Sequence, residues 1–553
     1  MSHLTQPVLR SRAAVAPADT HAAQHITPRL YRYGLVLALM LGAFVRLFPV
    51  LTADFPLNDG GLFFTMSEDI QRAGYALPEY TSYNQSQLPF AYSPLAFYLT
   101  AALGDVTSLD LVVIVRILPA VLSALTLGAF YLLARELLHS DLQVILATFA
   151  FAFLPRSFEW LIMGGGLTRA LGMLCLLLTV WQAVLLYQGG SKRHIVWCAW
   201  WGGLTVLSHP GIAWFAAFSC AIMFLFFGRT RKAVVHSLLV ATGVVLIVLP
   251  WVITIIERHN ASTFLAAGGS ASSYPLWLVT LNNLIMLSGE PGVQILLIVG
   301  LLGVAAIIAQ RQYLLPAWLA AIMLLDPRSA PTDASIPLAM LVAVGVDQVL
   351  LPGVTALIAK LNTTKTSPSG ASKRLSHAVL GLLLLYGFAT ATISANPVLH
   401  PRTALRPIAA ADRAAMQWIA QAPEETIPPE SQFLVLTSAD FWQIDAVIEW
   451  FPSLARHKSI TTVQGHEWLP DDQFADLQIQ YNLSRHCIPE GVECLEDWAR
   501  KSDTAFTHLY LSKSPRGNDE PERYFAALEA ELAANPAYKL IYSVPDVSIY
   551  TVR

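Results

Sequence analysis

The sequence predicts a polytopic α-helical membrane protein that carries a soluble α/β domain at its C-terminal end. Of its 553 residues, 55% are hydrophobic and only 13% are charged, against about 25% charged in soluble domains. Apolar runs that suit a bilayer crossing of roughly 17–25 residues recur as far as residue 395. From about Asn396 onward the composition becomes that of a soluble protein. We therefore expect a tail (1–28), a membrane domain (29–395) and a soluble domain (396–553).

The first predicted span covers residues 35–51. Four basic residues precede it, namely Arg10, Arg12, Arg29 and Arg32. The positive-inside rule therefore places the N-terminus in the cytoplasm. The tail is polar and Ala-rich and lacks the apolar core of a signal peptide, so we expect it to be disordered. Residues 52–110 then form the first external loop. Within this loop we expect a helix over residues 62–74 and an apolar segment at the membrane interface over residues 90–103.

Ten further spans complete a predicted set of about eleven. We place them at residues 111–133, 144–154, 167–186, up to 207, up to 228, 234–256, up to 311, up to 326, up to 351, and 378–393. Lys and Arg cluster in alternate loops, around residues 192–193, 229–232 and 360–374. The last span therefore ends outside the cytosol, and the soluble domain is predicted to be extracytoplasmic on a multi-pass protein of the plasma membrane. Residues 276–287 are predicted to lie at the interface.

The soluble domain shows short apolar runs typical of strands. We expect strands at residues 433–436, 508–511, 539–542 and 547–550, the last two paired, and helices at 411–420 and 521–532. A Gly-rich phosphate loop is absent from its sequence, which argues against a nucleotide site, and we expect no nucleic-acid partner. Cys487 and Cys494 lie in a polar segment and are candidates for a disulfide if this region is outside the cytosol.

Two carboxylates stand where the first span meets water. They belong to the stretch DFPLNDGG at residues 54–61, whose two glycines let a backbone approach a ligand closely. We predict that Asp59 is a catalytic base at the membrane surface, with Asp54 as the alternative. Further ionisable residues mark the external ends of spans: Glu68, Asp69, Arg116, Arg156, Glu159, Arg169, His209, Arg258, Asp326 and Arg328. Considered one at a time, most of these residues can be explained as polar residues at the ends of spans. Considered together, they indicate a functional cavity.

Two of these residues, and a run of three glycines, each have two interpretations. Arg116 lies inside a span, where it either meets a partner or an anion or extends to the outer interface. The run Gly164-Gly165-Gly166 suits close approach of a phosphate or, equally, a tight helix connection. His209 precedes Pro210, and we interpret it as a capping or structural residue rather than a base.

Several stretches, in this order, resemble one family. They are Asp59-Gly60 in the first external loop, PFAYSPLAFY at residues 89–98, RILPAVLSAL at 116–125 and YLLAREL at 131–137. Together they resemble the GT-C superfamily of integral-membrane glycosyltransferases, which includes protein O-mannosyltransferases, aminoarabinose transferases and oligosaccharyltransferases. The resemblance is clearest over about residues 32–160, and the predicted topology as far as residue 395 supports it.

The resemblance implies a sugar donor linked to a polyprenyl phosphate and bound from the bilayer. It also implies a glycan, lipid or protein acceptor on the external face. Asp59 matches the family's catalytic acidic residue, and Arg116 matches a recurrent arginine that opens the second span. Glu159 matches an acidic position that binds metal in some members, so a divalent cation such as Mg²⁺ or Mn²⁺ is a candidate cofactor. Further candidate contacts to substrate or metal are Glu68, Asp69, His209 and Tyr92.

The sequence departs from the family in two places. Tyr92-Ser93 stand where many members carry a basic residue. The donor phosphate would then be bound by one or more of five arginines: Arg116, Arg156, Arg169, Arg258 and Arg328. The Trp-Trp-Asp signature of oligosaccharyltransferases is absent, and EWFP at residues 449–452 is only a weak match to it. Transfer to asparagine of a protein is therefore disfavoured.

The residues fit this chemistry independently of the family. Phosphate is a good leaving group, so one base that removes the acceptor proton suffices, in contrast to the carboxylate pair of glycoside hydrolases. Cations stabilise the departing phosphate, and attack opposite to it inverts the anomeric centre. A lipid or sugar transporter or flippase would instead favour repeated halves and polar residues at the midplane of the bilayer. A non-catalytic membrane assembly protein is the remaining alternative.

Overall fold

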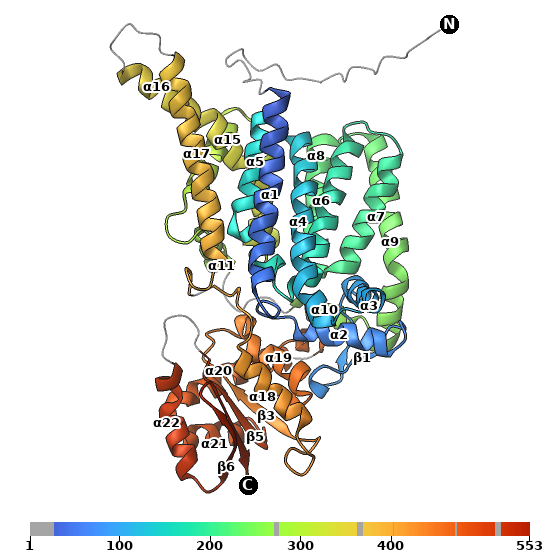
Figure 1. Ribbon diagram of the computed structural model, residues 1–553. Helices are drawn as coiled ribbons and strands as arrows, with labels where there is room; N and C mark the ends of the chain where they lie inside the picture. The colour runs from blue at the N-terminus through green and yellow to red at the C-terminus, as the bar shows by residue number, and fades with distance from the viewer. Residues whose placement is uncertain (1–26, 270–275, 362–368, 402, 471–472, 515–520) are drawn as a thin grey trace.

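The computed structural model describes residues 27–269, 276–361, 369–401, 403–470, 473–514 and 521–553. The predicted tail therefore lies almost wholly outside the described residues. Long helices stand side by side in one half of the molecule, and a sheet-containing domain occupies the other half (Figure 1). The long helices are α1 (Pro28–Thr52), α4 (Leu111–Leu137), α6 (Gly166–Tyr187), α8 (Pro210–Phe227), α9 (Arg231–His259), α15 (Ser335–Gly345) with its continuation α16 (Leu351–Leu361), and α17 (Ser369–Ser394).

Among the described residues, seven helices are long and apolar enough to cross a membrane. An eighth span results if α5 (Asp141–Phe153) is counted together with the short helical segment Pro155–Leu161, which bends away from it by 82°. Shorter helices occupy the remaining predicted positions: α7 (Arg193–Ser208), α12 (Ile295–Ala309) and α13 (Leu314–Leu325). Each of the eleven predicted apolar stretches thus contains a helix, while the number that cross the bilayer stays a prediction.

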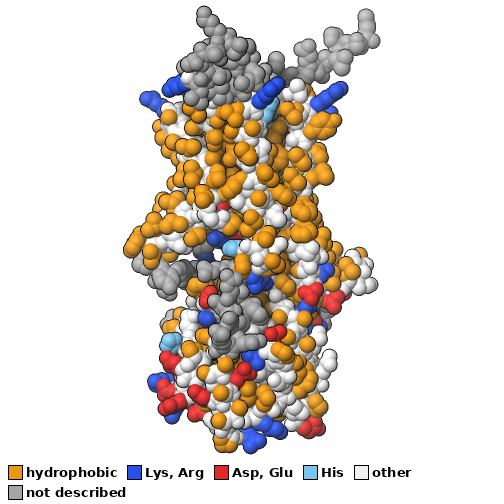
Figure 2. Space-filling model, turned by 60° about the vertical axis from the view of Figure 1, so that its left-hand side comes forward, with side chains coloured by type: hydrophobic (Ala, Val, Ile, Leu, Met, Phe, Trp, Pro, Cys, Tyr) orange, Lys and Arg blue, Asp and Glu red, His pale blue; other side chains and the backbone are white. Residues whose placement is uncertain are grey.

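The helical half has the surface of a membrane protein. A broad band of hydrophobic side chains covers it, and Lys and Arg side chains gather at the end away from the sheet domain (Figure 2). On α9, for example, Leu238 and Leu246 are exposed, as expected for side chains that face lipid. Only structures that satisfy their own backbone hydrogen bonds are stable in that environment, which explains why this half is helical.

The first loop after α1 lies between the two halves. It contains α2 (Gly61–Arg72), the hairpin β1 (Tyr80–Thr81) and β2 (Leu88–Pro89), and α3 (Leu95–Thr107) (Figure 1). The helix predicted over residues 62–74 is confirmed. Phe63 and Phe64 of α2 are both buried, Phe63 with the membrane helices and Phe64 with the soluble domain. Helix α2 is therefore enclosed between the two halves. The apolar segments predicted to be interfacial form α3 and α11 (Leu276–Ile285).

The soluble domain is built on a five-stranded sheet in the order β4-β3-β5-β7-β6. Its strands are β3 (Gln432–Leu436), β4 (Lys458–Ser459), β5 (His508–Ser512), β6 (Tyr538–Val544) and β7 (Val547–Val552). β3 is parallel to β4 and β5, whereas β7 is antiparallel to β5 and β6. The four predicted strands and their final pairing are confirmed. The two-residue β4 is the strand that the sequence did not predict.

Helices cover both faces of this sheet. They are α18 (Ala410–Gln421), α19 (Ala446–Ala455), α20 (Gln473–Glu490), α21 (Val492–Lys501) and α22 (Pro521–Ala534). Phe433 and Val435 of β3 belong to the core shared with α18 and α19, and Leu434 belongs to the core shared with α20 to α22. The alternation of a strand explains this division. A disulfide between Cys487 and Cys494 joins α20 to α21. α18 and α22 occupy the two predicted helical segments, whereas α19, α20 and α21 were not predicted.

Candidate active site

Asp59 lies in the tight connection between α1 and α2, and the glycine run before α6 holds this connection in place. The Gly165 N–H donates to both the backbone oxygen and Oδ1 of Asp59, each at 3.1 Å, and the Gly164 N–H donates to the Leu57 carbonyl at 2.9 Å. A Cβ atom would lie 2.1 Å from the Asp59 carbonyl oxygen at position 164 and 2.2 Å from Asp59 Oδ2 at position 165. Glycine is thus required at both positions, because the Asp59 loop packs directly against them.

The surroundings of Asp59 favour a proton acceptor. Burial raises the pKa of this carboxyl, while the charge of Arg169 and the hydrogen bond from Gly165 act in the opposite direction and only partly offset it. The carboxylate also lies at the N-terminal end of α6, where the helix dipole stabilises negative charge. A carboxylate whose pKa lies above the ordinary range removes a proton more readily than an exposed aspartate does.

Arg169 supplies a cation beside this carboxylate. It lies one turn into α6, and its guanidinium lies over the Trp160 ring at 5.4 Å from the centroid. Its Nη1 atom is buried and has no hydrogen-bond partner within the described part of the chain. A buried cationic donor without a partner is costly. The arrangement therefore suits an anion that enters the site.

Tyr92, His209 and Arg328 lie around Arg169. The rings of Tyr92 and His209 are 6.0 Å apart between centroids. His209 Nδ1 accepts a hydrogen bond from the Ile212 N–H at 3.3 Å and thereby caps α8. Burial, together with the charges of Arg169 and Arg328, lowers the pKa of His209 to about 3, so the ring is neutral at pH 7. This residue serves as a cap, and in its neutral form it adds no positive charge to the two arginines.

The soluble domain holds the Asp59 loop through Glu449 of α19. The Glu449 carboxylate accepts hydrogen bonds from three consecutive N–H groups, those of Gly60 (3.0 Å), Gly61 (2.8 Å) and Leu62 (2.8 Å). Burial and the neighbouring Asp59 charge raise the pKa of Glu449 to about 8, while the three N–H groups act in the opposite direction. Trp450 Nε1 donates to the Asn58 carbonyl at 3.0 Å. The backbone on both sides of Asp59 is thus fixed by the soluble domain.

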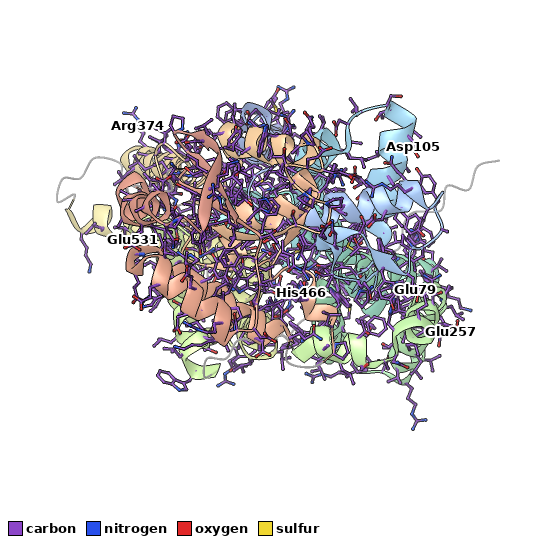
Figure 3. The ribbon with its side chains drawn as sticks, turned by 90° about the horizontal axis from the view of Figure 1, so that it is seen from below. Glu79, Asp105, Glu257, Arg374, His466 and Glu531 are labelled. Carbon is purple, nitrogen blue, oxygen red and sulfur yellow. A yellow bond between two sulfur atoms is a disulfide. The ribbon has the colours of Figure 1, made fainter. Side chains whose placement is uncertain are left out.

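A short 3-10 helix of the soluble domain, η6 (His466–Trp468), also reaches this region. Trp468 is 4% exposed, and its ring lies 5.3 Å from that of Tyr92. Burial raises the pKa of Glu467, while the Arg328 charge acts in the opposite direction. Seen from the soluble-domain end, His466 lies nearer the middle of the molecule than Glu531, Asp105 or Glu257 (Figure 3). Both halves of the chain therefore contribute side chains near Asp59.

Three of the five predicted phosphate-binding arginines have partners of their own. Arg116 donates to the Ala53 carbonyl at 2.8 Å, at the end of α1. Arg258 donates to the carbonyls of Leu77 and Pro78 at 2.9 and 3.1 Å. Arg156 donates to the Met286 carbonyl at 3.3 Å and lies 3.6 Å from Glu159. In the structure, Arg169 and Arg328 lie near Tyr92 and His209. The other three arginines contact backbone groups of loops and helix ends.

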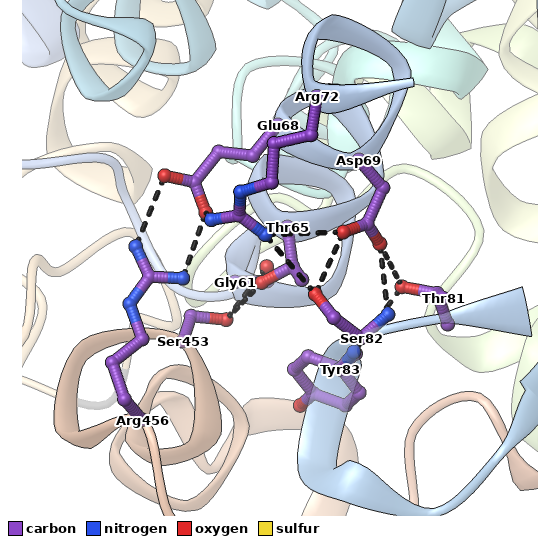
Figure 4. Close-up of polar contacts among 10 residues, drawn as sticks. All are labelled: Gly61, Thr65, Glu68, Asp69, Arg72, Thr81, Ser82, Tyr83, Ser453 and Arg456. Carbon is purple, nitrogen blue, oxygen red and sulfur yellow. Dashed lines mark hydrogen bonds and ion pairs between the residues drawn. The ribbon is translucent and has the colours of Figure 1, made fainter. Parts of the chain in front are cut away.

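Three predicted acidic candidates also serve the fold. Asp54 is exposed and forms an ion pair with Arg413 of α18. Asp69 accepts hydrogen bonds from Thr81 Oγ1 (2.7 Å) and from the Ser82 N–H (2.9 Å) and Oγ (2.7 Å) (Figure 4). Glu68 binds both guanidinium nitrogens of Arg456, at 2.8 and 3.0 Å, and also Arg72 at 2.9 Å. Asp69 thus fastens the β1–β2 hairpin to α2, and Glu68 fastens α2 to the end of α19.

The donor set does not fit the predicted divalent cation. Within the described ranges, no group of three or more His, Cys, Asp or Glu side chains could hold a metal ion. Glu159, the candidate ligand, is paired with Arg156, and the Glu449 oxygens are bound to backbone N–H groups. We therefore derive no step through a metal at this site.

Sequence reasoning missed the contribution of the soluble domain. In the sequence, Glu449 was noted only as part of a weak match to an oligosaccharyltransferase signature. Glu467 and Trp468 were not predicted to have any role. The available signal was weak: two Glu-Trp dipeptides of the soluble domain, at 449–450 and 467–468, which do not by themselves show that their glutamates are buried.

Solved membrane glycosyltransferases have the same fold. The oligosaccharyltransferase AglB from Archaeoglobus fulgidus, in complex with an inhibitory peptide and a dolichol-phosphate, matches with a TM-score of 0.54 and 13% identity, over 95% of this chain and 74% of that one. ArnT from Cupriavidus metallidurans in the apo state matches with a TM-score of 0.52 and 14% identity, over 94% and 97%. Arabinofuranosyltransferase AftD from Mycobacteria matches with a TM-score of 0.52 and 15% identity, over 96% and 40%.

These three proteins are GT-C membrane glycosyltransferases, and the chain has their fold. The recognition made from the order of motifs is therefore confirmed at the level of the fold. Neither a family model nor a curated protein matches the sequence.

Proposed function

We propose that the protein is a membrane glycosyltransferase that moves a sugar from a polyprenyl-phosphate donor to an acceptor on the extracytoplasmic face. The observation that carries this proposal is the proximity of the Arg169 guanidinium to the Asp59 carboxylate, whose pKa it lowers. A carboxylate of raised pKa lies near a half-buried arginine whose buried Nη1 has no partner in the described chain. Glycosyl transfer from phosphate needs one base and one phosphate-binding cation.

In the proposed mechanism, Asp59 removes the proton from the attacking hydroxyl of the acceptor. Arg169, with Arg328 nearby, binds the phosphate and stabilises the charge that grows on it as the bond to the sugar breaks. The neutral His209 and the Tyr92 ring shape the space between these groups. Attack from the side opposite to the phosphate inverts the anomeric centre. Glu449 and Trp450 act indirectly, by holding the loop on which Asp59 lies.

The donor class is inferred from two kinds of support. The candidate site contains two arginines, and it lies at one end of a helical bundle with an apolar surface. A donor with a phosphate and a lipid tail matches both of these features. Among the structures with the same fold, AglB was solved with a dolichol-phosphate, and ArnT was solved bound to undecaprenyl phosphate with a TM-score of 0.50 over 93% of this chain.

The reaction is tested with purified protein in lipid nanodiscs and a panel of polyprenyl-phosphate sugars with simple glycan and lipid acceptors. The measurement is the release of free polyprenyl phosphate and the anomeric configuration of the product. We expect release by the wild type, a loss of about 10²–10⁴-fold in Asp59→Asn, and an inverted product. Asp54→Asn is the matched control and should retain activity, because Asp54 is exposed and paired with Arg413.

Equal activity of Asp59→Asn and the wild type would contradict the assignment of the base. If no donor in the panel is either bound or cleaved, the proposal of a lipid-linked donor is wrong. Binding without cleavage, together with transfer of the intact donor across the bilayer, would support a flippase instead.

A further inference from the structure

The η6 segment places the carboxylate of Glu467 and the indole of Trp468 near Tyr92. Gly465, which precedes η6, has φ +89°, and a Cβ there would lie 2.6 Å from the Leu88 side chain. The Gly465 N–H donates to Glu467 Oε2 at 2.8 Å. The segment is thus closely packed against β2 of the first loop, and its side chains have a defined position relative to the site.

Trp468 has a buried polar atom without a hydrogen-bond partner in the described part of the chain. Its ring contacts Tyr92 at 5.3 Å and Phe264 of α10 (Ser262–Gly269) at 6.4 Å between centroids. Its Nε1 is buried and lacks a hydrogen-bond partner among the residues that the structure describes. Indole N–H groups usually find a partner when they are buried. This donor therefore has unused hydrogen-bonding capacity within the described chain.

Glu467 complements this donor with an acceptor. The Gly465 N–H is bonded to one carboxylate oxygen, Oε2, and a carboxylate has further lone pairs for acceptance on both oxygens. Arg328 and Tyr92 both interact electrostatically with this carboxylate. Figure 2 shows that the surface is hollowed at the boundary between the helical half and the soluble domain, with side chains of the Lys or Arg colour and of the His colour inside the hollow.

An aromatic face, an indole N–H and a carboxylate together match a sugar ring. The C–H face of a sugar packs on aromatic rings, while its hydroxyls donate to a carboxylate and accept from an N–H. Since Arg328 lies near Glu467, a sugar attached to a phosphate at the arginines would extend toward η6. We propose that Glu467, Trp468 and Tyr92 form the subsite that binds the hydroxyl-bearing ring of the transferred sugar. This inference rests on the proposed function, because it assumes that the phosphate binds at Arg169 and Arg328.

The test separates binding of the sugar from binding of the lipid phosphate. Dissociation constants are measured for undecaprenyl phosphate alone and for undecaprenyl phosphate that carries mannose, glucose or arabinose, with full-length protein in nanodiscs. The wild type should bind at least one glycosylated lipid more tightly than the bare lipid phosphate. Glu467→Gln and Trp468→Phe should each weaken the affinity for the glycosylated lipid by about tenfold and so remove most of this difference. The affinity of each variant for the bare lipid phosphate should stay within about twofold of the wild-type value.

Controls keep the result interpretable. Glu467→Gln retains an amide oxygen for the Gly465 N–H, and Trp468→Phe retains an aromatic ring, so both should unfold near the wild-type temperature. Glu430→Gln, an exposed site elsewhere in the soluble domain, should bind every ligand as the wild type does. Arg169→Gln should weaken binding of all the lipids, with and without a sugar.

The outcomes are distinguishable. If the wild type binds bare and glycosylated lipids equally, or if both η6 variants keep the full preference for the sugar, the subsite is wrong while the proposed function stands. If the wild type binds neither kind of lipid, the proposed function fails, and the subsite fails with it.

Discussion

The first loop carries two clusters of charge that look alike in the sequence and differ in the structure. Around Glu68 and Asp69 every carboxylate oxygen accepts a hydrogen bond from a neighbouring side chain or backbone N–H (Figure 4). Around Asp59, by contrast, Arg169 Nη1 and Trp468 Nε1 are buried without partners in the described chain. The density of charge is similar, but the carboxylates of the first cluster are fully bonded, whereas a guanidinium nitrogen and an indole N–H near the second cluster lack partners in the described chain. Unsatisfied donors near a carboxylate of raised pKa, rather than charge at helix ends alone, therefore point to the candidate active site.

The largest effect after loss of the base is expected for Arg169→Gln. Removing the cation should lower kcat by about 10²–10³-fold, because the charge that develops on the phosphate loses its stabilisation. The unfolding temperature should stay the same or rise, since a buried charge without a full set of partners is removed. A variant with normal kcat, or one that fails to fold, would place Arg169 with the structural cluster.

Glu449→Ala should affect both stability and catalysis. It leaves three consecutive N–H groups without an acceptor, so the free energy of unfolding should fall by about 2–4 kcal/mol. Because Asp59 is directly N-terminal to these groups, kcat should fall by about tenfold or more while KM for the donor changes little. Thermal unfolding and steady-state kinetics on the same preparation test this. A loss of stability with an unchanged kcat per folded molecule would show that Glu449 has a structural role and no effect on catalysis.

The pH dependence provides a test of smaller amplitude. In the proposed mechanism the ionised form of Asp59 is the base. Its pKa is raised by burial, so kcat/KM should fall as the pH decreases through this raised pKa. The acid limb should therefore lie above the value of about 3.9 of an ordinary aspartate. Arg169 lowers the pKa of Asp59, so Arg169→Gln should move the residual acid limb to still higher pH. A limb that does not move would show that the two groups are uncoupled.

The smallest effect is expected in the structural cluster. Glu68→Gln weakens a partly exposed ion pair with Arg456 and Arg72, whose side chains are 43% and 52% exposed. The cost should be about 0.5–1 kcal/mol, because solvent screens such pairs. Transfer activity per folded molecule should stay within about twofold of the wild type. A large loss of activity would mean that Glu68 contacts the substrate.

Much of the fold was predictable, because length and apolarity of a helix are local properties. The eleven apolar stretches, the helix after Asp59 and four strands of the soluble domain all came from patterns within short windows of sequence. The number of helices that cross the membrane could not be predicted in this way. Helices α7, α12 and α13 are short, and their position in the bilayer depends on packing against other helices. The bend of 82° after α5 likewise has no local signal beyond Pro155.

The site was predictable only in part. Asp59 stood out by its place after the first span, but the partners of Arg116, Arg258 and Asp54 are backbone carbonyls or a distant arginine that only the tertiary structure brings near. Glu449 is almost 390 residues from the loop that it holds. Such a contact has no periodicity or spacing from which a single sequence could reveal it.

The most direct test of this account compares the same substitution at two positions ten residues apart. Asp59→Asn and Asp69→Asn are purified in nanodiscs, and the unfolding temperature and the rate of polyprenyl-phosphate release are measured for both. The account predicts that Asp59→Asn lowers the rate of release by about 10²–10⁴-fold at an unchanged or higher unfolding temperature. It predicts that Asp69→Asn lowers the unfolding temperature and retains release per folded molecule. The reverse pattern, with release lost at Asp69 and kept at Asp59, would contradict the assignment of the active site.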